Sequence, residues 1–187
     1  VGAAIRRELL RDGQVFFVHN RVEDIDAVAS RLADQVPEAR VAVAHGQMSE
    51  HRLEQVIDAF WHKEIDVLVC TTIIETGVDV PSANTLIIEN ADRMGLSQLH
   101  QLRGRVGRGE RRGVCLLLNQ NHETGTPRRL EVLVNTDDGF KIAEADLALR
   151  GSGEISGDLQ HGLNEFKLID LIKDVNLITE AREDAAE

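Results

Sequence analysis

Three arginines lie within six positions of one another in the segment QLHQLRGRVGR, residues 98–108. They are Arg103, Arg105 and Arg108, separated by Gly104 and Gly107. Glycine lets the backbone approach a ligand closely, and the arginine guanidinium is a planar, permanently charged fork that matches phosphate oxygens. An arginine that reaches a transferred γ-phosphate adds several powers of ten to the rate. We therefore expect a phosphate-bearing ligand here, in preference to a surface cluster paired with acids.

A second polar segment, VCTTIIETGVDVP, covers residues 69–81. An apolar run ends at Thr71 and Thr72, and Gly77 and Asp79 follow before Pro81. Hydroxyls and backbone N–H groups where a strand meets a helix suit a phosphate, and an aspartate there can accept a hydrogen bond from a ribose hydroxyl. On spacing alone, a threonine helix cap followed by an Asx turn explains the segment equally well.

The remaining polar clusters are weaker signals. His45, Gly46 and Gln47 follow another apolar run, but histidine and glutamine at such a place are more often turn residues. The histidines and acids show no spacing typical of a metal site, and no Ser/His/Asp arrangement is visible. We expect no bound structural or catalytic metal among these residues.

Short apolar runs alternate with amphipathic segments over the first part of the chain. Runs that are apolar throughout predict strands buried on both faces, and the 3.6-residue period between them predicts helices, which together indicate a doubly wound α/β domain with a parallel sheet. Ser49 is expected to cap its helix. The predicted strands are 14–19, 40–44, 66–70, 85–89 and 113–119, and the predicted helices are 1–11, 22–35, 49–64 and 97–103.

Polar residues follow most of these predicted strands. In doubly wound sheets, ligands bind at the carboxyl ends of the strands, so these residues are expected to share one edge. They are His19-Asn20, His45-Gly46, Thr71-Thr72 and Glu89-Asn90.

The pattern changes after residue 120. Helices are predicted at 127–134, at 140–149 and from about 164 to the end, with a glycine-rich stretch at 150–157. None of this can extend a parallel sheet. We therefore expect an α/β domain over 1–120 and a helical appendage over 121–187.

Charge and composition narrow the class of protein. The 187 residues carry a net charge of −11, from 32 acidic and 21 basic residues, which alone argues against a nucleic-acid binder. Residues 93–112, however, contain six arginines and a single acid, Glu110, so an anionic ligand at one site is compatible. The apolar runs are too short to span a membrane, and the charged start does not resemble a signal peptide. Cys70 and Cys115 are expected to be reduced core thiols of a cytoplasmic protein.

The chain supplies arginines for a nucleotide but no phosphate-binding loop. It contains no G-x-x-x-x-G-K-[ST] segment and no apolar run that ends in Asp-Glu. These residues therefore predict half of a nucleotide site.

Several segments resemble the motifs of the second RecA-like domain of superfamily-two helicases. QLRGRVGR resembles motif VI, TTIIETGVDVP motif V, VAHGQM motif IVa and VFFVHN motif IV. The longer run GLSQLHQLRGRVGRG is similar to one bacterial branch, that of the fork-reversal helicase RecG and the transcription-repair coupling factor. The tail resembles the translocation motif of this branch.

The resemblance implies an ATP-dependent double-stranded DNA translocase of bacterial DNA repair and recombination. It implies ATP with Mg²⁺ held against an N-terminal RecA-like domain of the same protein, with Walker A and B preceding Val1, so the chain alone is expected to be inactive. By motif position the implied roles are arginine fingers for Arg105 and Arg108; nucleotide contacts for Gly77, Asp79, Gln101 and Gly104; DNA-backbone contacts for Asn20, His45, Gly46, Thr71 and Thr72; and coupling to the tail for Arg103, Arg150 and Gln160.

Three alternatives for function follow. The tail, especially residues 164–174, favours a RecG-like protein acting on branched DNA, whereas residues 13–48 read more like the coupling factor, whose partner is RNA polymerase. The third is a module that binds a nucleotide or phosphate through Arg103–Arg108 without catalysis.

Overall fold

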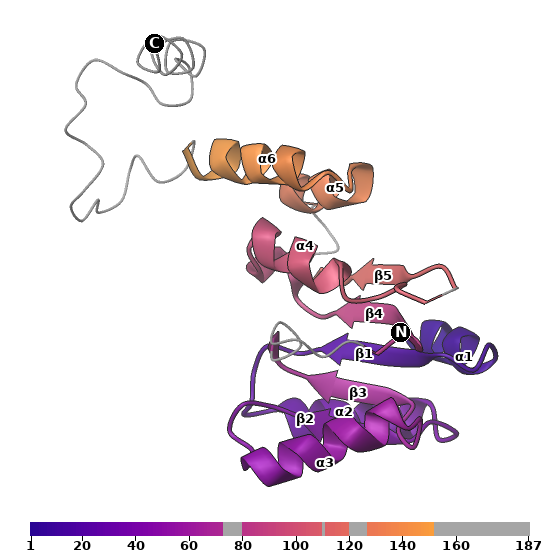
Figure 1. Cartoon of the computed structure of the whole chain (residues 1–187). Helices are drawn as coiled ribbons and strands as arrows, with labels where there is room; N and C mark the ends of the chain where they lie inside the picture. The colour runs from indigo at the N-terminus through magenta and orange to yellow at the C-terminus, as the bar shows by residue number, and fades with distance from the viewer. Residues whose placement is uncertain (73–79, 110, 120–126, 152–187) are drawn as a thin grey trace, which may run out of the picture. The chain divides into compact units, whose positions relative to one another are not determined.

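A five-stranded parallel sheet forms the centre of the computed structural model, which describes residues 1–72, 80–109, 111–119 and 127–151 (Figure 1). The strand order is β2-β3-β1-β4-β5, and every neighbouring pair is parallel. The expected doubly wound α/β fold is confirmed. The strands are β1 (Gln14–Val18), β2 (Val41–Ala44), β3 (Val67–Cys70), β4 (Ala83–Ile88) and β5 (Val114–Leu117).

The burial of the strands follows their position in this order. β1, β3 and β4 lie between two neighbours and are buried at every residue, which is why most of their residues are apolar. The polar exceptions, Gln14, Asn84 and Thr85, lie toward the amino ends of β1 and β4. β2 and β5 lie at the edges and remain partly exposed.

Helices pack on both faces of the sheet, because successive strand residues point to opposite sides. Val15 and Phe17 of β1 belong to a core cluster with Ile5 of α1 and Val28 of α2. Phe16 points the other way, and its ring lies 5.0 Å from that of Phe60 in α3. The helices are α1 (Gly2–Leu9), α2 (Ile25–Gln35), α3 (Glu50–Trp61), α4 (Leu96–Arg103), α5 (Arg128–Asn135) and α6 (Gly139–Gly151), with a short 3-10 helix at Ala91–Arg93.

One helix start differs from the sequence expectation, and another agrees with it. α2 begins at Ile25, not near Val22, because the carboxylate of Asp24 is bound by His19 and the preceding residues form a turn. Ser49 does occupy the N-cap position of α3, but its side chain makes no capping hydrogen bond there. The expected N-cap position of Ser49 is therefore confirmed, without a capping hydrogen bond from its hydroxyl.

A buried carboxylate fastens α1 to the sheet. Glu8 is 1% exposed and accepts hydrogen bonds from Thr85 Oγ1 in β4 and from the Arg11 guanidinium, at 2.6 Å for the closer arginine nitrogen. Arg11 also donates to the backbone carbonyl of Arg112, at 3.3 Å. The amino end of β4 and the segment before β5 are thus tied to the same helix.

The described part of the tail is helical. α5 and α6 confirm the helices expected at 127–134 and 140–149. The third expected helix, from about 164, and most of the glycine-rich stretch lie outside the described residues. Contacts divide the chain into units of Val1–Ala143 and Glu144–Glu187.

Candidate functional site

The carboxyl ends of four strands bring the expected polar residues to one edge of the sheet. The register pairs Ala44 with Cys70, Cys70 with Val18, and Val18 with Ile88. The residues that follow these four positions are therefore neighbours in the same order: His45, Thr71, His19 and Glu89.

Asn20, His45 and Gly46, the expected DNA contacts of this edge, lie at or near the surface. Asn20 and Gly46 are exposed and His45 is half-buried. His45 Nδ1 accepts a hydrogen bond from the backbone N–H of Gln47 at 3.3 Å, and the backbone N–H of His45 lies 3.4 Å from Met48 Sδ. These contacts close the turn between β2 and α3. His45 and Gln47 are therefore turn residues, as the sequence suggested, and this does not prevent them from also contacting a ligand.

Only part of the second polar segment is described. Thr71 is 9% exposed, and its backbone N–H donates to the carbonyl of Ala44 at 3.3 Å, which continues the ladder past the ends of β2 and β3. Thr72 is half-buried. The expected nucleotide contacts Gly77 and Asp79 lie outside the described residues.

α4 positions the arginine segment. Leu96, Leu99 and Leu102 are buried at the helical spacing and anchor the helix, which leaves Gln101 exposed. The helix ends at Arg103, with Gly104 as its C-cap. The three buried leucines hold α4 in place and thereby determine the position of Arg103 and of the arginines that follow it.

The arginine loop, defined as residues 104–113, is built on glycines. Gly107 has φ of +72°, and an added Cβ would lie 2.7 Å from the backbone nitrogen of Gly113. A Cβ on Gly109 would lie 2.7 Å from the carbonyl oxygen of Pro81, the end of the second polar segment. Backbone thus packs directly on backbone, and only glycine fits at these positions.

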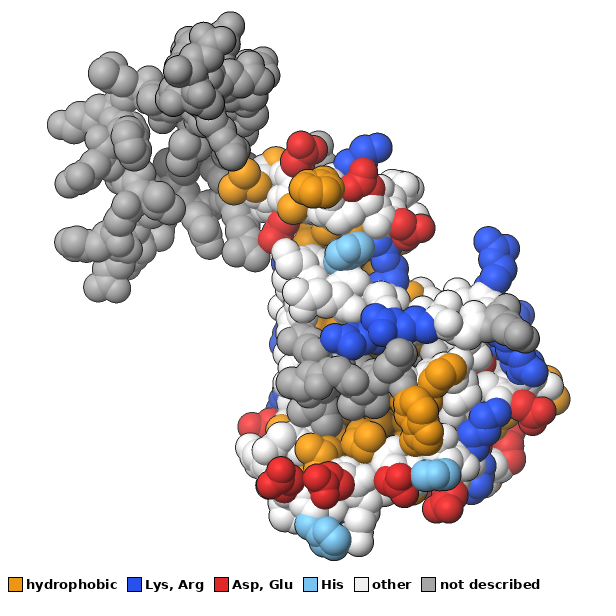
Figure 2. All heavy atoms as spheres, viewed as in Figure 1, with side chains coloured by type: hydrophobic (Ala, Val, Ile, Leu, Met, Phe, Trp, Pro, Cys, Tyr) orange, Lys and Arg blue, Asp and Glu red, His pale blue; other side chains and the backbone are white. Residues whose placement is uncertain are grey.

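The two expected arginine fingers lie on this loop. Arg105 is half-buried, and Arg108 is exposed, with its Nε donating to the carbonyl of Gly104 at 2.8 Å. Figure 2 shows basic side chains gathered over the segment between α4 and β5, while acidic side chains lie along the lower margin over α3. This local gathering of basic side chains agrees with the sequence of residues 93–112, which contain six arginines and one acid.

Arg103 points toward α5 and is 19% exposed. One terminal nitrogen donates to the carbonyls of Leu133 and Thr136, at 2.6 and 3.0 Å, and lies 3.0 Å from Asp137 Oδ1. The side chain of Arg150 and the whole of Gln160, its expected partners, are outside the described residues. The sequence did not predict the contacts with Leu133 and Thr136, because any residue offers a backbone carbonyl and its side chain does not indicate that the carbonyl will be bound.

A hollow of about 440 Å³ borders this arginine and the arginine loop, and Cys115 lines it. Burial raises the pKa of the Cys115 thiol to about 11, an effect that the charge of Arg103 partly offsets. The thiol is protonated near neutral pH and is a packing group. Burial likewise raises the pKa of the Cys70 thiol.

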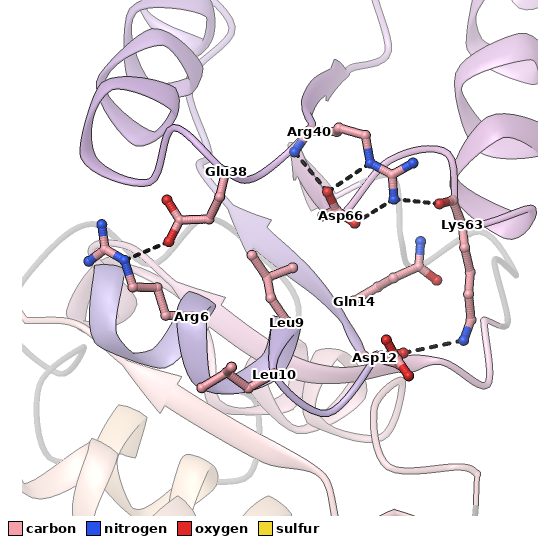
Figure 3. A pocket seen from close by; sticks show the side chains of 10 residues that line it. Arg6, Leu9, Leu10, Asp12, Gln14, Glu38, Arg40, Lys63 and Asp66 are labelled. Atoms are coloured by element: carbon pink, nitrogen blue, oxygen red, sulfur yellow. Dashed lines mark hydrogen bonds and ion pairs between the residues drawn. The ribbon is translucent and has the colours of Figure 1, made fainter.

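A hollow of about 710 Å³ lies at the amino ends of the strands, away from these motifs (Figure 3). Its charged side chains pair with groups of the same hollow: Arg6 Nε lies 2.7 Å from Glu38, and Arg40 binds Asp66 at 2.7 Å. Lys63 Nζ donates to the carbonyl of Asp12 at 3.2 Å. This hollow contains none of the residues expected to bind a ligand.

The described residues contain no cluster of three or more His, Cys, Asp or Glu side chains that could hold a metal ion. In the same part of the chain, no helix has both the length and the apolar character that a membrane crossing requires.

The five-stranded parallel sheet with its flanking helices has the fold of a RecA-like helicase C-terminal domain, and comparison with known proteins agrees. The family model for the helicase conserved C-terminal domain matches residues 2–110, and the model for the C-terminal part of domain 3 of the ATP-dependent DNA helicase RecG matches residues 136–187. This chain belongs to the helicase conserved C-terminal domain family.

Similar proteins come from both parts of the expected branch. The transcription-repair-coupling factors of Mycobacterium tuberculosis and Escherichia coli are 54% and 52% identical over 87% and 88% of this chain. The structure of RecG bound to a three-way DNA junction is 40% identical, with a TM-score of 0.72, and covers 95% of this chain and 24% of that one. This chain spans about a seventh of the length of the two coupling factors, at 14% and 15%.

Proposed function

We propose that the chain is the second motor domain of an ATP-dependent double-stranded DNA translocase that acts in bacterial DNA repair. One observation carries the proposal: the glycine-built arginine loop packs against Pro81, at the end of the segment that follows the sheet's ligand-binding edge. The arginines proposed to face the nucleotide and the strand edge proposed to contact DNA lie in the same compact unit, Val1–Ala143. The similarity to RecG and to the coupling factors supports the same reading.

In this proposal, Arg105 and Arg108 meet the γ-phosphate of ATP only when a neighbouring RecA-like domain closes on the loop. The residues fit such a ligand, because the loop backbone lacks Cβ atoms where it turns and Arg108 is exposed on it. Ligands for Mg²⁺ and the phosphate-binding lysine would come from the neighbouring domain. Loss of the γ-phosphate removes the preference for the closed arrangement, so each cycle shifts this domain along DNA.

The DNA-contacting residues in this proposal are Asn20, His45, Gly46, Thr71 and Thr72. Small polar side chains and backbone N–H groups contact the phosphate backbone without reading sequence, which suits a protein that must move along any duplex. Gln101 and Gly104 complete the nucleotide side of the site. Arg103 passes changes in the arginine loop to α5, and Arg150 and Gln160 remain proposed partners in the tail.

The chain could come from either of two kinds of protein. Sequence identity of 52–54% over most of the chain favours a transcription-repair coupling factor, whose partner is RNA polymerase. The match of residues 136–187 to the RecG model favours a protein that remodels branched DNA, as the tail predicted. Two assays of the intact protein distinguish these possibilities. Displacement of a stalled RNA polymerase would support a coupling factor, and regression of a model replication fork would support a RecG-like protein.

The arginine-finger assignment is tested in the intact motor protein with Arg108→Ala and a matched control, Arg111→Ala, which removes an exposed arginine of the same loop. We expect Arg108→Ala to lower ATP hydrolysis by about a thousandfold, the lower range for an arginine finger, and to leave fork-DNA affinity within about twofold. Arg111→Ala should retain hydrolysis. Equal loss of hydrolysis and DNA affinity in Arg108→Ala would refute the assignment.

A non-catalytic nucleotide-binding module makes the opposite prediction for the isolated chain. It requires measurable affinity for ATP without a second domain, whereas half of a site does not. Calorimetric titration of the 187-residue chain with a nonhydrolysable ATP analogue separates the two. Tight binding would eliminate the motor proposal.

A further inference from the structure

His19 lies between two carboxylates at the carboxyl end of β1. Its Nδ1 is 2.6 Å from Glu89 Oε2 and its Nε2 is 2.7 Å from Asp24 Oδ1, while its side chain is only 5% exposed. Glu89 follows β4, and Asp24 immediately precedes α2. One buried ring therefore joins three elements of the fold.

The backbone around this ring is fixed by the sheet. The register that pairs Val18 with Ile88 places His19 beside Glu89. The ladder also continues beyond the strands, because the N–H of His19 donates to the carbonyl of Cys70 at 2.8 Å and the N–H of Glu89 donates to Val18 at 3.0 Å. The contacts of the His19 ring with Glu89 and Asp24 therefore add to backbone hydrogen bonds that already hold this part of the sheet.

The contacts define the charge of the ring. An ionised carboxylate can only accept hydrogen bonds, so a ring that bonds two carboxylates must donate from both nitrogens, and only the imidazolium does so. The pKa of the Asp24 carboxyl lies below its ordinary value, first because of the hydrogen bond from His19. Asp24 is therefore ionised at neutral pH and requires a donor.

Other charged groups surround this cluster on each side. Arg21 Nε lies 3.6 Å from the same oxygen of Asp24. On the other side, Glu89 shares a hollow of about 550 Å³ with Arg31 and Asp34 of α2 and with the amino-terminal residue Val1. On β3, Cys70 contributes a neutral thiol.

We propose that His19, as an imidazolium clamped between Glu89 and Asp24, is a positioning residue that holds Asn20 at the DNA-contacting edge. The inference rests on the proposed function, because it concerns the DNA side of that site. Asn20 directly follows the clamped residue and is exposed. With the ring neutral, one carboxylate loses its donor and the turn from Asn20 to Asp24 is released from β4.

The test uses the intact motor protein with His19→Gln, which keeps a neutral donor but cannot carry the charge. We expect the duplex concentration for half-maximal ATPase stimulation to rise about tenfold, the loss of one charge-assisted hydrogen bond, with the DNA-independent rate unchanged. The control is His62→Gln, because His62 faces one carboxylate, Asp58, at 3.3 Å on an exposed surface. It should behave as wild type.

A second variant tests the clamp from the side of β4. Glu89→Gln keeps an acceptor for the His19 ring but removes the charge of one of its two carboxylate partners. We expect it to raise the duplex concentration for half-maximal ATPase stimulation in the same direction as His19→Gln, again with the DNA-independent rate unchanged. This variant also serves if His19→Gln does not fold.

A spectroscopic readout is independent of motor activity. ¹⁵N-histidine spectra of the 187-residue chain should show both His19 nitrogens protonated at neutral pH. A neutral His19 tautomer in these spectra overturns the inference. So does wild-type DNA dependence in His19→Gln, provided that duplex stimulates the wild type; a wild type indifferent to duplex refutes the proposed function itself.

Discussion

The guanidinium of Arg103 donates a 2.6 Å hydrogen bond to the backbone carbonyl of Leu133, so the last residue of α4 holds the final turn of α5. The same nitrogen reaches Thr136 and Asp137, and another lies 3.0 Å from His100 Nδ1. The arginine loop begins one residue later. We therefore expect a movement of that loop to be transmitted to α5 through these polar contacts.

Replacement of Arg103 by alanine tests this transmission. In the intact motor protein we expect duplex translocation to fall at least about tenfold while ATP hydrolysis falls much less, because the carbonyls of α5 lose their donor and about 1–3 kcal/mol of stabilisation. Arg129→Ala is the matched control, since Arg129 makes a single, longer contact of 3.4 Å to the carbonyl of Asp92. Proportional loss of both activities in Arg103→Ala would argue against coupling.

Gly107→Ala tests the backbone packing of the arginine loop. Its φ of +72° and the 2.7 Å approach to Gly113 leave no room for a methyl group, so the loop must shift, at a cost of about 1–3 kcal/mol. We expect a lower Tm and at least a tenfold loss of hydrolysis. Gly104→Ala should leave the Tm unchanged, because its nearest neighbour is 3.4 Å away and its backbone is helical. An unchanged Tm for Gly107→Ala would show that the close contact does not stabilise the loop.

The buried carboxylate of Glu8 makes a second packing prediction. A Cβ on Gly13 would lie 1.6 Å from Glu8 Oε1, so Gly13→Ala should destabilise the fold by about 1–3 kcal/mol in denaturant titration. In Gly2→Ala the added atom meets only the flexible Gln35 side chain, at 3.2 Å, and the effect should be smaller. In the double variant with Glu8→Ala, the cost of Gly13→Ala should shrink; full additivity would contradict a direct clash.

The ion pair of Arg40 and Asp66, visible in Figure 3, predicts a dependence of stability on pH. Burial opposes ionisation of Asp66, but hydrogen bonds from the Arg40 side chain and backbone outweigh it, and the pKa of Asp66 is lowered. A lowered pKa contributes stability above the unfolded value, near 4, that is lost as the pH falls through the folded value. The stability difference between wild type and Asp66→Asn should therefore narrow below about pH 4. A difference that stays constant down to pH 2, in acid titrations followed by circular dichroism, would exclude this origin.

The burial pattern explains why the sheet could be predicted so fully. β1, β3 and β4 are covered on both faces, and such strands must be apolar at nearly every position, which is visible without a structure. The arginine loop could be singled out from the sequence, because glycine and arginine are residue types that suit a phosphate, and its ligand stays a prediction. The start of α2 was not, because the carboxylate that defines it, Asp24, is bound by a histidine five residues earlier.

The amino-acid sequence by itself determined the class of fold, the edge of the sheet where polar residues gather, and the segment that carries the arginines, because these depend on local residue type and period. Only the tertiary structure decided which groups meet across that frame: His19 with Glu89, Arg103 with the carbonyls of α5, and Gly109 with Pro81. Such contacts depend on the order of the strands and on how closely backbone segments approach. The partners are 70 and 30 positions apart for His19 and Arg103, and residue type alone does not indicate which distant residues will meet.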